Sequence, residues 1–152
     1  MMELFFDLLL PRDHLTVPMV RHLFGASLDR LGVATECVEE LELAVTEACS
    51  NALKHAHVGE EQYEVSARVD GRSAEVTVTN LGPPGELPES SSVAALDAES
   101  GRGMLLMSHL VDHLSFRRND DSTSVKLSKK LTLTEGSVLR QLAPAHLARP
   151  TP

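Results

Sequence analysis

Residues 40–57 read ELELAVTEACSNALKHAH, and the spacing of their side chains decides the fold. Together with Val38, the apolar ones recur every three or four positions, which places them on one side of an α-helix: Leu41, Val45, Ala48, Cys49, Ala52 and Ala56. Glu40, Glu47, Asn51 and Lys54 recur at the same spacing on the other side. The pattern predicts an amphipathic helix from about Glu36 to about His57, and the polar side of such a helix usually faces water.

The composition is that of a single globular domain. The chain has 152 residues, 42% of them hydrophobic, and a formal net charge of −8. An acidic chain does not suit a nucleic-acid-binding protein, because neutralising phosphates requires a basic face. No apolar run approaches the roughly 18 residues of a membrane span. We therefore expect neither nucleic acid nor a membrane as a partner.

The cysteines and the N-terminal run favour a cytoplasmic protein. Cys37 and Cys49 fall on the same predicted helix, about 18 Å apart at roughly 1.5 Å per residue, which is beyond disulfide reach. The apolar run from Leu4 to Leu10 contains Asp7 and has neither a basic start nor a small-residue cleavage site. We interpret this run as a core strand rather than a signal peptide. Reduced thiols and the missing signal point to the cytoplasm.

The other segments alternate between strand and helix patterns. We predict, in chain order, a strand at 2–10, a helix at 16–32, the helix at 36–57, a hairpin of strands 63–69 and 74–79, a long loop at 80–100, a helix opened by 101–103, and a hairpin of strands 114–117 and 124–127 whose last strand runs to about 133. This order predicts an α+β fold, a two-layer sandwich of a mixed, mostly antiparallel sheet with helices on one face. Residues 1–133 are expected to form the domain, and 134–152 a flexible C-terminal tail.

Three short stretches carry residues suited to one ligand site. Glu47 and Asn51 are four positions apart on the predicted helix, so both side chains can reach the same ligand. A second stretch, VTVTNLG at 76–82, ends a strand, and a third, GRGM at 101–104, opens a helix after the long loop. The glycines of the third stretch leave backbone N–H groups at a helix start, where phosphate binds.

In order and context these stretches resemble the GHKL ATPase superfamily, and within it the small bacterial serine kinases that act as anti-sigma factors. The resemblance covers about Leu4 to Leu131 and implies a Bergerat-type ATP-binding fold with ATP and Mg²⁺ as cofactors. It implies that Glu47 is the catalytic general base, or orienting group, for the attacking hydroxyl. It also implies that Asn51 is the metal ligand, since a neutral oxygen donor suits Mg²⁺. The nucleotide-binding residues that it implies are Asn51, Lys54, Asn80, Gly82, Gly101, Arg102, Gly103 and Met104. For Lys54, a solvated side chain or an ion pair is the alternative.

Two positions depart from the family. Where the family has an aspartate that accepts a hydrogen bond from the adenine amino group, this chain has Asn80. Its amide oxygen can accept the same bond, but an uncharged acceptor is weaker. Where a second loop glycine is usual, Pro84 follows Pro83, and two prolines stiffen the loop and remove two donors. We therefore expect a lower nucleotide affinity than is usual in the family.

The resemblance implies an ATP-dependent protein serine kinase and anti-sigma factor. Such a protein binds a sigma factor, phosphorylates a serine on an antagonist (anti-anti-sigma) protein, and is usually a homodimer. The departures at Asn80 and at Pro83-Pro84 leave a second hypothesis open. In it, a catalytically weak or inactive protein of the same fold sequesters a sigma factor or antagonist without phosphorylation. A third hypothesis is an unrelated α+β protein whose polar helix faces are only solvated.

Overall fold

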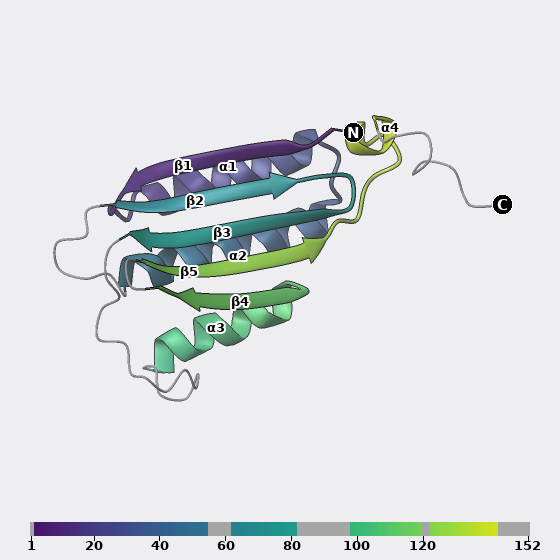
Figure 1. The fold of residues 1–152 in the computed structure, drawn as a ribbon. Helices are drawn as coiled ribbons and strands as arrows, with labels where there is room; N and C mark the ends of the chain where they lie inside the picture. The colour runs from purple at the N-terminus through teal and green to yellow at the C-terminus, as the bar shows by residue number, and fades with distance from the viewer. Residues whose placement is uncertain (1, 55–61, 82–97, 120–121, 143–152) are drawn as a thin grey trace.

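The computed structural model describes residues 2–54, 62–81, 98–119 and 122–142 (Figure 1). Its elements are, in chain order, β1 (Leu4–Pro11), α1 (Thr16–Arg30), α2 (Thr35–Lys54), β2 (Gln62–Val69), β3 (Ser73–Leu81), α3 (Ala98–Leu110), β4 (His113–Arg118), β5 (Ser122–Lys130) and α4 (Val138–Gln141). The five strands form one sheet in the order β1-β2-β3-β5-β4, and each neighbouring pair is antiparallel. The predicted α+β sandwich is confirmed, although the described strands include none of the parallel pairs that a mixed sheet would need.

The helices form the second layer. Helices α1 and α2 lie side by side on one face of the sheet, and α3 lies beside α2 near β4 (Figure 1). The predicted apolar stripe of α2 is buried against the sheet: Val38, Leu41, Val45, Ala48, Cys49 and Ala52. The predicted end of this helix, from His55 to His57, lies outside the described residues.

Strands β2 and β3 present alternate side chains to the helices. On β2 these are Tyr63, Val65, Ala67 and Val69, and on β3 they are Ala74, Val76, Val78 and Asn80. The predicted turn at Asp70 joins the strands, and its carboxylate accepts the backbone N–H groups of Arg72 at 2.7 Å and Ser73 at 2.9 Å. Because the alternation continues to Asn80, a polar side chain ends an otherwise apolar row beneath the helices.

Residues 134–142, predicted as the start of a flexible tail, instead pack onto the domain. Strand β5 ends at Lys130 rather than near Leu133, and Leu133 forms an isolated antiparallel bridge with Val33. Leu139, on the short helix α4, is 2% exposed and belongs to the hydrophobic core. The apolar side chains of this segment, Val138, Leu139 and Leu142, span too few positions to set a helix or strand period, so the pattern did not predict this docking. The rest of the predicted tail, residues 143–152, lies outside the described residues.

The turn between α1 and α2 is where this C-terminal segment attaches. Gly32 has a φ of 85°, and a Cβ added there would lie 2.5 Å from the Cα of Ser137. Only glycine adopts this backbone conformation without strain, and only a missing side chain permits so close an approach. The Ser137 hydroxyl is buried and donates to the Leu31 carbonyl at 2.6 Å. The backbone N–H of Thr134 donates to the Gly32 carbonyl at 2.8 Å.

Both cysteines are buried and are not joined in a disulfide, as their predicted separation on one helix requires. Burial in the core raises the pKa of the Cys49 thiol to about 12, so this thiol is protonated at neutral pH. Among the described helices, none combines the length and the apolar character that crossing a membrane would require.

Candidate functional site

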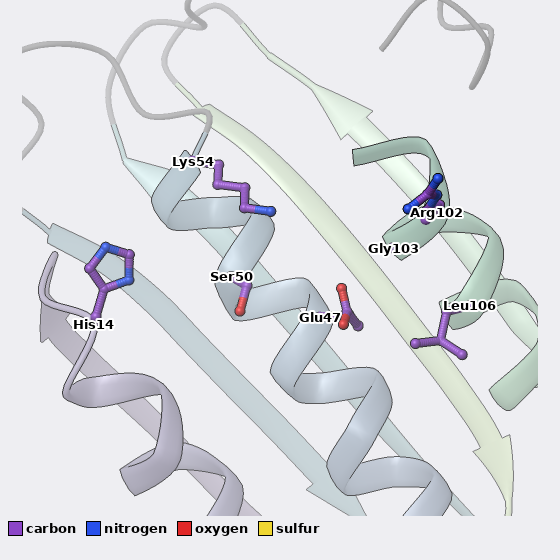
Figure 2. A pocket seen from close by; sticks show the side chains of 7 residues that line it. All are labelled: His14, Glu47, Ser50, Lys54, Arg102, Gly103 and Leu106. Carbon is purple, nitrogen blue, oxygen red and sulfur yellow. The ribbon is translucent and has the colours of Figure 1, made fainter. Parts of the chain in front are cut away.

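A pocket of about 340 Å³ lies across the outer side of α2, between the start of α1 and the start of α3 (Figure 2). It is lined by His14, Glu47, Ser50, Lys54, Arg102, Gly103 and Leu106. This volume falls within the range of roughly 300–1,000 Å³ that is typical of small-molecule sites. Four of these residues, Glu47, Lys54, Arg102 and Gly103, were predicted as site residues from the sequence.

Helix α2 supplies the middle of the pocket. Glu47, Ser50 and Lys54 follow one another at three- and four-residue spacing, so they emerge on the same helix face. Figure 2 shows Glu47 on the side of α2 that faces α3, with Ser50 and Lys54 further toward the end of the helix. Lys54 and Arg102 bring two positive charges to the pocket, and Glu47 brings a carboxylate.

Glu47 and Asn51 meet α3 at Gly103. Gly103 is buried, and a Cβ added to it would lie 2.7 Å from Glu47 Oε2 and 3.7 Å from Asn51 Oδ1. Asn51 is only 8% exposed, although the sequence pattern placed it on the water-facing side of α2. The physical reason for the difference is that α3 packs over this part of α2 and covers it. Asn51 does not itself line the pocket, but its buried amide lies close to Gly103, which does, next to the half-buried carboxylate of Glu47.

Asn80 lies at the end of β3 on the face covered by helices, and it is 8% exposed. Its Oδ1 atom is buried and receives no hydrogen bond within the part of the chain that the structure describes. A buried polar atom without a partner costs about 1–3 kcal/mol. The side chain is not among those that line the described pocket. An incoming donor at Asn80 would remove this cost.

The glycines of the third stretch lie inside a helix rather than before one. Helix α3 begins at Ala98, so Gly101 falls in its first turn and Gly103 beyond it. A helix leaves only its first four N–H groups without an internal partner. Contrary to the prediction, the Gly103 amide is therefore not available to a phosphate.

The remaining predicted residues have different placements. Met104 is partly buried and packs against the hydrophobic core, so its side chain does not line the pocket. Gly82 lies outside the described residues. Sequence reasoning did not select His14, Ser50 or Leu106. Ser50 could have been found, because it lies three residues after Glu47 on the same helix face. His14 could not, because it reaches the pocket from a loop 33 residues earlier in the chain than Glu47.

Arg12 ties that loop to the end of α2. Its Nη2 group donates to the Ala52 carbonyl at 3.1 Å and also to the Leu53 carbonyl. The last carbonyls of a helix have no partner within it, and a cation there also interacts favourably with the helix dipole. Arg12 therefore holds the helix turn that carries Asn51 and Lys54 against the connection that carries His14.

Residues 10–129 match the family model described as the histidine kinase-like ATPase domain. The chain is 31% identical over 139 residues to the serine-protein kinase RsbW of Bacillus velezensis, with 84% of this chain and 86% of that protein covered. It is 29% identical to the RsbW of Bacillus subtilis over the same length and the same shares of the two chains. It is 31% identical over 111 residues to the RsbW of Listeria monocytogenes, covering 66% of this chain and 70% of that protein.

A solved structure has the same fold. The crystal structure of the RsbU and RsbW domains of Rv1364c from Mycobacterium tuberculosis superposes with a TM-score of 0.65 at 16% sequence identity. The match covers 84% of this chain and 32% of that one.

Proposed function

This chain belongs to the histidine kinase-like ATPase domain family, and on that premise we propose that it is an ATP-dependent protein serine kinase and anti-sigma factor. In this proposal it acts in the cytoplasm as a homodimer, binds a sigma factor, and phosphorylates a serine on an antagonist (anti-anti-sigma) protein. The observation that carries the proposal is the placing of Glu47 and Asn51 on one face of α2, in contact range of α3 and beside two cationic side chains. The proposal is also supported by the similarity to two relatives that are named serine-protein kinases.

The donor set suits Mg²⁺ bound together with a nucleotide. Mg²⁺ usually takes one or two protein oxygens and completes its shell with waters and substrate phosphates. Asn51 offers one neutral oxygen next to the pocket, and the described residues contain no cluster of three or more His, Cys, Asp and Glu side chains placed to hold a metal ion. When bound, the ion would neutralise charge on the phosphates. Lys54 and Arg102 would bind the same phosphates as cations.

In the proposed reaction Glu47 takes the proton of the attacking hydroxyl. The serine Oγ forms a bond to the γ-phosphorus, the bond from that phosphorus to the β–γ bridging oxygen breaks, and ADP leaves with that oxygen. The hydroxyl proton moves to the Glu47 carboxylate, which is half-buried in the pocket and close to Asn51. The protein contributes this base, the position of the phosphates and the exclusion of water on the α3 side.

Asn80 supports purine recognition in the same proposal. Its buried Oδ1 lacks a donor among the described residues, and an adenine amino group would supply one. This fit rests on an orphaned atom of this chain, and it accounts for an otherwise unfavourable amide at the end of an apolar strand face.

Calorimetric titration with ATP and ADP, with and without Mg²⁺, tests the nucleotide half of the proposal. We expect binding that depends on Mg²⁺ in the wild type and loses that dependence in Asn51→Ala. Transfer of labelled γ-phosphate to candidate antagonist proteins then tests the kinase half, with Glu47→Ala as the inactive control. Absence of binding at millimolar nucleotide would contradict the proposal.

The second candidate is a binding protein of the same fold that sequesters its partner without phosphorylation. The amide at Asn80, where a carboxylate is usual, and the prolines at 83 and 84 favour it. It predicts that the wild type and the Glu47→Ala variant bind the sigma factor or antagonist equally well. Phosphorylation that disappears in Glu47→Ala would exclude it.

A further inference from the structure

We infer that Gly103 is a positioning residue for Glu47, because the missing side chain leaves the space that the Glu47 carboxylate occupies. The inference rests on the proposed function, in which Glu47 is the base, and it adds a steric role for a glycine otherwise expected to bind phosphate through its amide. It makes the contact between α3 and α2 part of the catalytic geometry.

The backbone does not explain why this residue is glycine. Gly103 lies within α3, and among the glycines that the structure describes only Gly32 has a positive φ. Within a helix, glycine is less favourable than alanine, so the position carries a cost that some other factor must offset. Its amide also lies beyond the first four N–H groups of the helix. Neither conformational freedom nor a helix-end amide accounts for the glycine.

The surroundings of Gly103 give a reason. An added Cβ would lie 2.7 Å from Glu47 Oε2, closer than real Cβ contacts, while Asn51 Oδ1 would remain at an ordinary 3.7 Å. An alanine at 103 would therefore meet the carboxylate first and push it away from α3. Glu47 has a long, flexible side chain, so the chain would accommodate the methyl group by moving the reactive oxygen rather than by unfolding. A displacement of about 1 Å at a reacting group can cost roughly 100-fold in rate.

The other neighbour of α2 provides a matched control. Gly25 of α1 is also buried, and a Cβ added there would lie 2.5 Å from Oε1 of Glu42, another glutamate of α2. Both glycines thus contact a glutamate of the same helix, and the contact at Gly25 is the tighter one, because Cδ and Cγ of Glu42 would also lie 2.6 and 2.9 Å from the added Cβ. Glu42 and Gly25 are not among the residues that line the pocket. A general effect of tight helix packing would appear at both positions, whereas positioning of the base would appear only at Gly103.

The first experiment measures Mg·ATP affinity by calorimetry and the steady-state hydrolysis of Mg·ATP for wild type, Gly103→Ala and Gly25→Ala. In hydrolysis, water replaces the serine hydroxyl as the attacking group, and Glu47 accepts its proton. We expect Gly103→Ala to lower kcat by about 10- to 100-fold while the dissociation constant changes less than about threefold. We expect Gly25→Ala to leave both unchanged. An unchanged kcat in Gly103→Ala, or an equal fall in Gly25→Ala, would overturn the inference.

The second experiment does not depend on activity. Thermal unfolding is measured for Gly103→Ala in the wild-type background and in the Glu47→Ala background. Without the Glu47 side chain, the better helix propensity of alanine should raise Tm by about 2–4 °C, whereas with Glu47 present the clash should cancel that gain. Equal Tm changes in the two backgrounds would mean that Gly103 does not act through Glu47. A wild type that neither binds nor hydrolyses ATP would refute the proposed function, and the Tm comparison would still decide whether Gly103 sets the Glu47 position.

Discussion

At the N-terminal end of α2, which we call the closed end, the turn after α1 is joined to the C-terminal segment by hydrogen bonds and by close packing at Gly32. Ser137 donates to Leu31, Thr134 donates to Gly32 through both its backbone and its hydroxyl, and no Cβ stands between Gly32 and Ser137. The segments that meet there come from two parts of the chain, the turn between α1 and α2 and the segment that follows β5. Among the described residues, no buried side-chain polar atom at this end lacks a hydrogen-bond partner.

The C-terminal end of α2, which we call the open end, is built differently. Asn51 is buried beside a pocket, Glu47 rests against a neighbouring helix, and nearby in the sheet the buried oxygen of Asn80 has no donor among the described residues. A domain that can satisfy its polar groups at one end and leaves an acceptor unsatisfied at the other is carrying a cost where a ligand would remove it. The contrast teaches that an unmet buried acceptor, more than charge alone, distinguishes the end at which we propose the nucleotide site.

The largest expected difference between the two ends concerns catalysis. Glu47→Ala should lower phosphoryl transfer by about 10²–10⁴-fold, since it removes the proposed general base, while Mg·ATP affinity changes little. The measurement is single-turnover transfer of labelled γ-phosphate, or hydrolysis in the absence of a protein acceptor. Glu42→Ala, on the same helix but away from the pocket, is the control. A fall of the same size in both variants would remove the distinction drawn here.

At the closed end the largest effect is on stability. Gly32→Ala should lower the free energy of unfolding by about 3 kcal/mol, because the new Cβ meets the Ser137 backbone and the positive φ strains alanine. Urea unfolding followed by circular dichroism measures it. Gly136→Ala serves as the matched control, since a Cβ at Gly136 meets nothing within 4 Å. Similar midpoints for the two variants would contradict the steric role of Gly32.

A smaller effect at the open end is expected on nucleotide affinity, with little effect on stability. Asn51→Ala should weaken Mg·ATP binding by about 10- to 100-fold, roughly 1.4–2.7 kcal/mol, and should abolish the difference between titrations with and without Mg²⁺. Stability should fall little by comparison, since Asn51 is not part of the hydrophobic core. Retained Mg²⁺ dependence in the variant would remove Asn51 from the metal site.

The smallest expected effect comes from placing a stronger hydrogen-bond acceptor at position 80 of the open end. Asn80→Asp replaces a neutral acceptor with a charged one, and charged acceptors form hydrogen bonds about twice as strong. We expect ATP affinity to rise by roughly 3- to 10-fold and the apo protein to lose stability, since the buried carboxylate lacks a donor until nucleotide binds. Calorimetry and thermal unfolding, each with and without ATP, measure the two effects. Unchanged ATP affinity would argue against a role of residue 80 in purine binding.

The sequence predicted those features that depend on local periodicity. The stripe on α2 follows from a spacing of three to four residues and the first hairpin from a spacing of two, and the structure has both, together with the predicted second hairpin. The burial of Asn51 could not be read in this way, because it arises when α3 packs across α2. The place of His14 in the pocket depends on the Arg12 clamp between distant segments. The docking of residues 134–142 depends on Gly32 and Ser137, whose fit exists only in three dimensions.

The hydrogen bond from Ser137 to Leu31 joins residues that are 106 positions apart. The hairpins, by contrast, join neighbours, and contacts between distant positions carry the greater loop-closure entropy and tend to form later in folding. The closed end is therefore expected to be the last part of the domain to assemble. We expect changes at Gly32 to act mainly on the rate at which the native protein opens, and only weakly on the rate at which it folds. Its closure would then set the lifetime of the folded state, and with it the time for which the pocket at the other end stays formed.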